Sequence, residues 1–467
     1  MNAASTNAVS TLAAFAVACR DAELPAAVRA DVPARVLDIL GLALAAGGGP
    51  GPDAVLRSVR RWGGVAESTV VGAGDRLPAP AAALVNGTLA HALDFDDTHL
   101  PSVLHPSASV VPAGLATAEA AGASGAALLA AVAAGIEITN RLGMAAYDPQ
   151  LANSIFFERG LHATSICGAI GSAAAAGLLL GLDADGVASA MGVAASMGAG
   201  LLEANRAGGT VKQAHCGWAA HAGVSAAYLA LDGLTGPPTV LEGRFGFFAA
   251  YADGRFSKPA LLDDLGTRWE LLRTAYKPYP SNHFTHPGID CALALRAAGL
   301  DPSTVDWMEL GVAAAPLRTI GEPRAEKTRP RSTYHAKFSG PYTVAAALLG
   351  GGGLGVGLAD FEGDLVPERL ALAARVRVVP DDRATSLFPH AFAAVLRAGV
   401  GGTVHEHRVD ASKGSAEAPL TPAELDLKFR LNATRALPGD RATALSTAVR
   451  DLERAASLAP ILSLTTS

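Results

Sequence analysis

The stretch NGTLAHALDFDDTHLPSVLHPSASVVP, residues 86–112, places acids and histidines inside a sequence otherwise rich in Ala, Leu, Gly and Val. Charged residues make up only 17% of the 467-residue chain, so a dense polar group needs a reason. Burying several carboxylates costs much free energy unless they are paired, protonated or used in chemistry. We therefore expect a functional site here rather than a solvated helix end. Its polar residues are His91, Asp94, Asp96, Asp97, Thr98, His99 and His105.

The composition of the whole chain favours closely packed helices and a small-molecule function. Hydrophobic residues make up 50% and aromatic residues 5%, so the apolar bulk consists of small side chains, and Ala is the best helix former. The net charge is -6 with both signs interspersed, so we expect neither a nucleic acid nor a membrane surface as partner. A small anionic carboxylate remains compatible with a local positive pocket. The four cysteines lack metal or cluster spacing and are expected to be buried thiols.

The apolar segments of the chain are expected to lie inside a globular protein. Residues 1–23 have no basic segment ahead of their apolar run, so we predict no signal peptide and a cytoplasmic location. The run 186–202 is rich in Ala and Gly and flanked by helix-ending residues, which is typical of a buried helix rather than a membrane span.

Residues 1–274 are expected to form an all-helical domain. Apolar residues recur at three- and four-residue spacing, and Gly and Pro separate the periodic segments. The expected helices are 9–22, 26–46, 52–61, 78–93, 112–121, 124–142, 165–180, 183–197 and 212–231.

The pattern changes near Trp269, where Pro and charge increase and segments typical of strands appear. We expect a smaller α+β lid domain at 275–405, with an edge strand at 307–315, a strand at 374–379, a hairpin of 394–397 and 403–409, and a helix at 342–349. The tail, 406–467, returns to helix with a capping box at Thr421–Glu424 and should complete the helical domain. The predicted fold class is thus mostly α, with a large all-helical domain built from both chain ends and a smaller α+β lid.

Three further segments carry candidate functional residues in apolar surroundings. His162 precedes an Ala-rich helix, whose N-terminus would favour an anion and a neutral imidazole. Lys212 and His215 are three residues apart and would share a helix face, where Lys can pair with a carboxylate. The segment KPYPSNH, 277–283, lies where the composition changes, and clefts between domains often hold sites. Taken alone, each segment also has an ordinary structural explanation.

Two other interpretations bear on cofactors. The acidic stretch could hold a divalent metal through Asp and His, or it could transfer protons. The literal GxGxxG at 350–355 follows a helix rather than a strand, so it predicts a helix end and not a dinucleotide site.

Taken in order, these segments resemble the MmgE/PrpD family over nearly the whole chain. The matching motifs are DILG from Asp38, HALDFDDTH from His91, the His162 segment, VKQAHCG from Val211, LEG from Leu241 with Phe245-Gly246, KPYPSNH from Lys277 and FSGPYTVA from Phe338. The resemblance implies a helical domain with a lid, a homodimer, and activity without a metal or organic cofactor. Members include 2-methylcitrate dehydratase, cis-aconitate decarboxylase and iminodisuccinate epimerase. The site residues implied by position are Asp94, Thr98, His105, His162, Lys212, Lys277 and His283.

Two departures from the family pattern argue against decarboxylation. The spacing from Thr98 to His105 is one residue longer than in the decarboxylases. The Tyr that those decarboxylases place ahead of the FS segment has no counterpart around 316–319, and Tyr334 lies too late.

The mechanism hypothesis is a cofactor-independent dehydratase that removes a proton next to a carboxylate of a 2-hydroxy di- or tricarboxylate such as 2-methylcitrate. Lys212 and Lys277 would neutralise carboxylates, and His105 and His162 would be the acid/base pair. Asp94 would orient a His or serve as base, and closure of the lid near Lys277 would exclude water. Further substrate contacts are expected from Thr98, His215, Tyr279 and His283. The alternatives are an epimerase of a substituted succinate, a cis-aconitate decarboxylase, a metal-dependent lyase and a non-catalytic carboxylate-binding protein.

Overall fold

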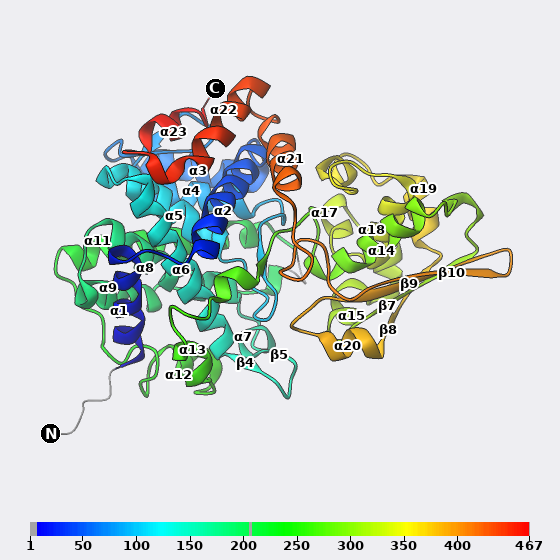
Figure 1. Ribbon diagram of the computed structural model, residues 1–467, viewed down its shortest axis with the longest axis horizontal. Coiled ribbons are helices and arrows are strands. Elements are labelled where there is room, and N and C mark those ends of the chain that lie inside the picture. Colours follow the sequence, from blue (N-terminus) through cyan, green and yellow to red (C-terminus); the bar gives the residue numbers. More distant parts are fainter. Residues whose placement is uncertain (1–6, 205–207, 467) are drawn as a thin grey trace. The chain divides into compact units, whose positions relative to one another are not determined.

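The computed structural model describes residues 7–204 and 208–466, which divide into two compact units (Figure 1). The first, the helical unit, comprises the described residues up to Thr274 together with those from Phe429 onward. The second, the α+β unit, runs from Ala275 to Lys428, beyond the residue 405 expected for the lid. Residues 1–6, part of the segment used for the signal-peptide expectation, lie outside the described residues.

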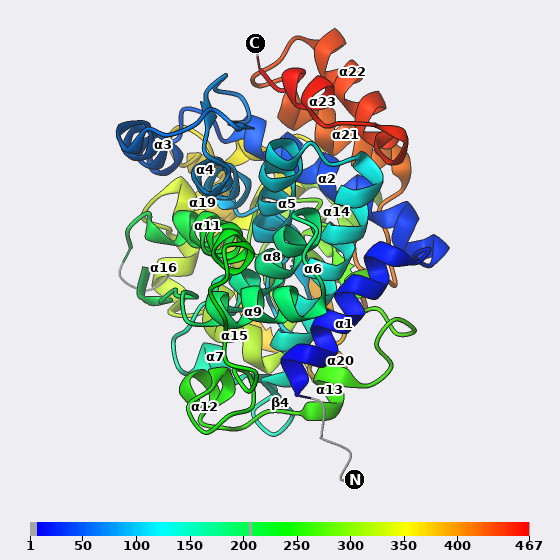
Figure 2. The ribbon, with the colours of Figure 1, turned by 90° about the vertical axis from the view of Figure 1, so that its left-hand side faces the viewer.

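The helical unit is built around α8 (Ala163–Leu179), in which every residue is buried. Figure 2 shows α5, α6, α9 and α11 surrounding α8, and these helices make its main contacts. A helix buried on all sides has no polar face, which explains its run of Ala, Gly and Ile. The other helices of the unit are α1 (Ala8–Asp21), α2 (Ala26–Ala45), α3 (Pro50–Trp62), α4 (Ala79–His91), α5 (Ser107–Ala121), α6 (Gly125–Ala145), α7 (Ile155–Glu158), α9 (Ala184–Ala195), α11 (Val211–Leu231), α12 (Phe247–Ala252), α13 (Lys258–Leu262), α22 (Gly439–Arg450) and α23 (Ala459–Ser463).

Short extended segments connect these helices. The pairs β1 (Ser68–Thr69) with β2 (Arg76–Leu77) and β4 (Tyr147–Asp148) with β5 (Asn153–Ser154) are antiparallel. β3 (Thr98–His99) lies within the acidic stretch. β6 (Thr274–Ala275) and α21 (Pro422–Ala433) straddle the boundaries of the two units.

Two glycines set the distance between α4 and α11. A methyl group on Gly87 would lie 2.7 Å from the Cα of Gly217, and one on Gly217 would lie 2.8 Å from the backbone nitrogen of Thr88. Neither distance accommodates a side chain, so only glycine permits this backbone contact. The contact brings the end of α4 and the first turns of α11 together.

α5 begins at Ser107, five residues before the expected start at Pro112, so that prediction was wrong. The reason is a cap supplied from outside the helix: the carboxylate of Asp97 accepts the backbone N–H of Ser107 at 3.2 Å and its hydroxyl at 2.5 Å. Satisfying a first-turn donor in this way lets the helix start directly after Pro106. Pro112 then lies inside the helix.

The C-terminal helices complete the helical unit. Figure 2 shows α22 on the same side of the unit as α2, and the two helices are in contact. The backbone N–H of Gly125 donates to the carbonyl of Ala455. Gly41 of α2 leaves just enough room for the ring of Phe429. The expected capping box is present at the start of α21, where Thr421 and Glu424 each bind the other's backbone N–H.

The α+β unit contains a four-stranded sheet in the order β10-β9-β7-β8. The strands are β7 (Trp307–Val312), β8 (Val376–Pro380), β9 (Ala394–Val400) and β10 (Thr403–Val409). The hairpin of β9 and β10 was predicted, and its turn uses Gly401 and Gly402 at positive φ. α14 (His286–Ala297) and α18 (Gly340–Leu349) cover one face of the sheet (Figure 1). The shorter helices are α15 (Ala314–Ile320), α16 (Arg324–Thr328), α17 (Thr333–Ala336), α19 (Pro367–Ala373) and α20 (Asp382–Leu387).

β7 is an internal strand and not the expected edge strand. It pairs antiparallel with β9 on one side and parallel with β8 on the other. Both partners come later in the chain, so the local pattern could not reveal that Met308 and Leu310 are enclosed. Gly350 at positive φ ends α18, as expected for the glycine run at 350–355.

The predominance of helices and the few short strands confirm the predicted mostly-α fold class. Among the described residues, α6 alone is a single helix long and apolar enough to span a membrane, and most of it is buried within the protein. The four cysteines are buried free thiols, as predicted.

Candidate functional site

The helical unit brings four histidines together, and we call His91, His105, His162 and His215 the histidine cluster. His91 is the last residue of α4, His105 lies near the end of the loop 92–106, His162 is the N-cap of α8, and His215 lies in the second turn of α11. The close contact of α4 with α11, and of α11 with α8, places these elements side by side.

The four rings are consecutive neighbours in the order His215, His162, His91 and His105. The ring centres of His215 and His162 are 5.0 Å apart, those of His162 and His91 are 5.6 Å apart, and those of His91 and His105 are 5.3 Å apart. The Nδ1 atoms of His162 and His215 lie 3.0 Å from each other, so one ring donates a hydrogen bond to the other. Gly200 makes room for this pair, because a methyl group there would lie 3.2 Å from His162 Cβ and 3.4 Å from His215 Nδ1.

Two rings of the histidine cluster are held neutral. Burial lowers the pKa of His162 well below its ordinary value, and the nearby His91 and Lys212 lower it further. Burial likewise lowers the pKa of His215 to about 4, with smaller contributions from His91 and Lys212. The sequence hypothesis attributed a neutral His162 to the N-terminus of its helix, whereas burial is the main cause in the structure. At neutral pH both rings are therefore neutral imidazoles.

Lys212 supplies the cation next to the histidine cluster. It occupies the first turn of α11, and its Nζ lies 3.4 Å from Oδ1 of Asp94. Both side chains are buried, so the pair is poorly screened by solvent. Asp94 has a φ of 54°, a left-handed conformation that Asp adopts more readily than most residues. The predicted shared face of α11 is present, because Lys212 and His215 both face this region.

Asp96 and Asp97 hold the loop that carries His105. Oδ2 of Asp96 lies 2.8 Å from Nδ1 of His91 and 3.9 Å from Nδ1 of His105. Nδ1 of His105 donates to the carbonyl of Asp97 at 2.5 Å and lies 3.3 Å from the hydroxyl of Thr98. Arg35, which is buried, binds the Asp97 carboxylate at 2.8 Å. Burial raises the pKa of Asp97 to about 6, against the opposing effects of Arg35 and Ser107.

His99 belongs to a separate polar network in the same loop. Its Nδ1 lies 2.7 Å from the hydroxyl of Ser102, and its Nε2 lies 3.1 Å from the carboxylate of Glu270. Burial raises the pKa of Glu270, but the hydrogen bond from His99 and the charges of His99 and Arg273 together bring it down to about 2. Both ring nitrogens of His99 are therefore occupied by protein groups.

The structure thus brings six of the predicted site residues together in one region of the helical unit, namely Asp94, Thr98, His105, His162, Lys212 and His215. The other three belong to the α+β unit. There Lys277 and His283 are buried, and Nε2 of His283 lies 3.5 Å from the hydroxyl of Ser412. The hydroxyl of Tyr279 donates to Asp290 at 2.6 Å, which is a structural contact. Roles for Lys277, Tyr279 and His283 in the site stay predictions.

Sequence reasoning assigned no role in the site to His91 or Asp96, although both lie in the stretch that it singled out. His91 reads as an ordinary helix end, and only folding places its ring between those of His105 and His162. The signal available in the sequence was the spacing: a His at the end of a helix and an Asp five residues later can meet when the chain turns in between.

One group among the described residues could hold a metal ion. Ligand atoms of His91, Asp96 and Cys216 all lie within 4.8 Å of one another, and all three residues are buried. Burial raises the pKa of the Cys216 thiol well above its ordinary value, and the charge of Asp96 raises it further. A metal would have to displace the thiol proton before binding there. The expected absence of a metal cofactor stays a prediction.

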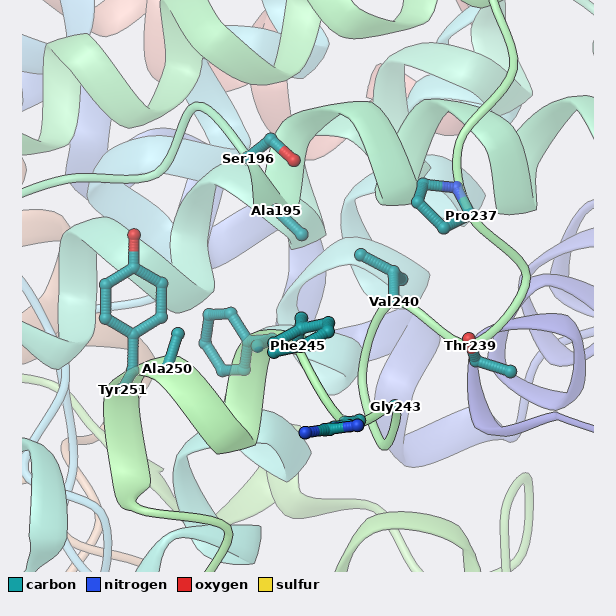
Figure 3. A pocket seen from close by; sticks show the side chains of 12 residues that line it. Ala195, Ser196, Pro237, Thr239, Val240, Gly243, Phe245, Ala250 and Tyr251 are labelled. Atoms are coloured by element: carbon teal, nitrogen blue, oxygen red, sulfur yellow. The ribbon is translucent and has the colours of Figure 1, made fainter.

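A pocket elsewhere in the helical unit contains none of the predicted site residues. It has a volume of about 640 Å³ and is lined by the end of α9, by α12 and by the loop between Pro237 and Phe247. Figure 3 shows Val240, Phe245 and Tyr251 around it. The hydroxyl of Tyr251 is bound to the carbonyl of Gly198 at 2.8 Å, and the single charged side chain of the lining is that of Arg244. Its mostly apolar lining does not suit a polycarboxylate.

The site combines buried neutral imidazoles with an ammonium–carboxylate pair in a mostly-α chain. These are the groups that an enzyme uses to transfer protons to or from carbon. Comparison with known proteins gives this class a name. The chain matches the MmgE/PrpD N-terminal domain over residues 10–259 and the MmgE/PrpD C-terminal domain over residues 279–454. The protein belongs to the MmgE/PrpD family, and it is an enzyme of the lyase type.

Its curated relatives include cis-aconitate decarboxylases. The chain is 33% identical to the one from Mus musculus over 429 residues, which cover 90% of this chain and 85% of the relative. It is 34% identical to the one from Homo sapiens over 399 residues, 83% of this chain and 79% of the relative. It is 25% identical to the cis-aconitate decarboxylase-like protein oryM of Aspergillus oryzae over 484 residues, 98% of this chain and 97% of the relative.

Proposed function

We propose that this protein is a cofactor-independent dehydratase of a 2-hydroxy di- or tricarboxylate such as 2-methylcitrate. The observation that carries the proposal is the neutral state of His162 and His215 beside the buried pair of Lys212 and Asp94. Neutral imidazoles accept protons, and an enzyme that starts by removing a proton from carbon needs such a group.

His162 acts as the base in this proposal. The hydrogen it removes lies on a carbon next to a substrate carboxylate, so negative charge develops on that carboxylate as the C–H bond breaks. The ammonium of Lys212 stabilises this charge in a buried site, where electrostatic interactions are strong. Asp94 holds the ammonium in place before the substrate binds.

His105 acts as the acid. Its Nδ1–H donates to the Asp97 carbonyl, and the carboxylate of Asp96 lies 3.9 Å away, a contact that favours a positive charge on the ring. The C–O bond of the substrate then breaks, and the hydroxyl leaves as water with the proton from His105. Thr98, whose hydroxyl lies 3.3 Å from the ring, orients it.

Decarboxylation of cis-aconitate is the second candidate, and the names of the relatives favour it. In that reaction a C–C bond breaks, CO₂ leaves, and an acid protonates the resulting carbanion. The same Lys212 would stabilise the charge, with His105 as the acid. Against it stands the α15 segment Ala314–Ile320, which contains no Tyr, and Tyr334 lies in the separate helix α17.

The test is proton NMR in deuterated water with chelator-treated enzyme and a panel of 2-methylcitrate, citrate, cis-aconitate and iminodisuccinate. Dehydration of 2-methylcitrate removes the hydrogen beside its methyl group, so the methyl doublet should become a singlet. Loss of cis-aconitate with formation of methylenesuccinate would identify a decarboxylase instead. Deuterium entry into an α-carbon without net elimination would identify an epimerase. No reaction with any member of the panel would contradict the proposal.

A further inference from the structure

His91 is buried within the histidine cluster, and the acid/base roles of His105 and His162 leave it without a function. The whole residue is 2% exposed, and its Nδ1 is bound to Asp96 at 2.8 Å. Its Nε2 has no hydrogen-bond partner within the part of the chain that the structure describes. A buried polar nitrogen without a partner costs free energy and calls for an explanation.

The dehydration proposed above leaves the acid and the base in the wrong protonation states. His162 has gained the proton from the C–H bond, and His105 has given one to the leaving hydroxyl. The substrate has lost one water in total, so the enzyme recovers its starting state when one proton passes from His162 to His105. Decarboxylation also leaves its acid in need of a proton.

His91 lies between these two residues. Its ring centre is 5.6 Å from that of His162 and 5.3 Å from that of His105. Rings at this spacing can exchange a proton through one bridging water. The His105 end of this path has more access to solvent than His91, because the side chain of His105 is 12% exposed and that of His91 is 1% exposed.

We propose that His91 and Asp96 form a proton relay that connects His162 with His105 and restores both after each turnover. Nε2 of His91 accepts the proton from His162, and the ring becomes an imidazolium. Asp96, which contacts both His91 and His105, stabilises that positive charge along the path. The proton then passes to His105, and no bond to carbon changes in this step. The inference rests on the proposed function, because it assigns the route by which that reaction resets.

His91→Gln is the direct test, with single-turnover and steady-state rates measured on the substrate identified by NMR. The relay acts after the chemical step, so the single-turnover rate should stay within about threefold of wild type while the steady-state rate falls roughly 10²-fold. The variant should therefore show a burst of one product per site. Adding imidazole buffer should raise the slow rate in proportion to its concentration, since a diffusible base can replace the relay. Asp96→Asn, which keeps the shape of the side chain, should show the same pattern and serves if His91→Gln does not fold.

Two matched variants separate the relay from other roles. His221→Gln removes an imidazole of α11 outside the histidine cluster and should leave both rates unchanged. Cys216→Ala removes the thiol that a metal centre with His91 and Asp96 would need, and it too should leave both rates unchanged.

Three results would overturn the relay. Equal losses in the single-turnover and steady-state rates of His91→Gln would make His91 a structural residue or the base itself. A steady-state rate equal to that of wild type would make it dispensable. A loss of activity in Cys216→Ala, together with zinc bound by wild type and not by His91→Gln, would establish a metal centre. Wild-type enzyme without any turnover on the panel would instead contradict the proposed function.

Discussion

His91 and His99 lie in the same polar stretch and both are buried, yet their surroundings differ. His99 uses both ring nitrogens for protein contacts, one to Ser102 and one to Glu270, and Glu270 in turn binds Arg273. His91 uses only Nδ1, and within the described residues its Nε2 has no hydrogen-bond partner. The network around His99, in which every ring nitrogen has a partner, holds the loop in place. An imidazole nitrogen without a hydrogen-bond partner, such as Nε2 of His91, can accept a proton. The difference marks His99 as a structural group and His91 as the group to which the proposed relay is assigned.

Lys212→Met should give the largest effect. It removes the ammonium next to the histidine cluster while keeping most of the side-chain volume. We expect kcat/KM to fall about 10³-fold through loss of charge stabilisation in the transition state. The free energy of unfolding, measured with urea, should fall as well, since the buried carboxylate of Asp94 loses its cationic partner. A Lys212→Met enzyme with wild-type kcat/KM would show that this side chain is not part of the site.

His99→Gln should give the next largest effect, and on stability rather than on chemistry. Removing the ring takes one buried hydrogen-bond donor from the carboxylate of Glu270. It also removes the hydrogen-bond partner of the Ser102 hydroxyl. We expect a loss of about 2–3 kcal/mol in the free energy of unfolding. The kcat of the folded fraction should stay within a few-fold of wild type. A large loss of kcat at unchanged stability would erase the distinction between the two histidines.

Acid should destabilise the protein through His215. The folded-state pKa is lowered to about 4 by burial, whereas the ring has its ordinary pKa of 6.5 in the unfolded chain. As the pH falls from 6.5 towards 4, the unfolded chain therefore binds a proton that the folded protein does not, and stability decreases. The loss at pH 5 should be on the order of 1–2 kcal/mol. Urea titrations at pH 7 and pH 5 should show a smaller decrease in His215→Gln, and an equal decrease would rule out His215 as the cause.

His221→Gln should give the smallest effect. The ring packs on Trp218, and its Nδ1 bonds the carbonyl of Pro80 at 3.0 Å. Glutamine retains a donor, so we expect a loss of about 1 kcal/mol or less in the free energy of unfolding. The melting temperature and the turnover rate of His221→Gln, each compared with wild type, test this prediction. A strong loss of turnover would show that α11 as a whole, and not the histidine cluster, controls the activity.

Local periodicity predicted most helices because Ala, Leu and Val recur at helical spacing and Gly or Pro ends each segment. It failed where the deciding contact came from elsewhere in the chain. The start of α5 depends on the Asp97 carboxylate, and the internal position of β7 depends on partners far along the sequence. In the site, spacing placed Lys212 and His215 on one face of α11. It could not place His162 against His215 or His91 between two other rings, because those contacts come from helix packing.

The contact of Gly87 with Gly217 has a consequence for how this enzyme can change over generations. α4 ends in His91 and Lys212 lies in the first turn of α11, so the crossing of these two helices fixes how far the imidazole lies from the ammonium. Any side chain larger than hydrogen at either glycine would force the two helices apart and move His91 away from Lys212. Selection therefore cannot change the distance between His91 and Lys212 in small steps through this helix crossing. A lineage that acquires a new substrate has to change residues in the loops, while the spacing of His91 and Lys212 is inherited unchanged.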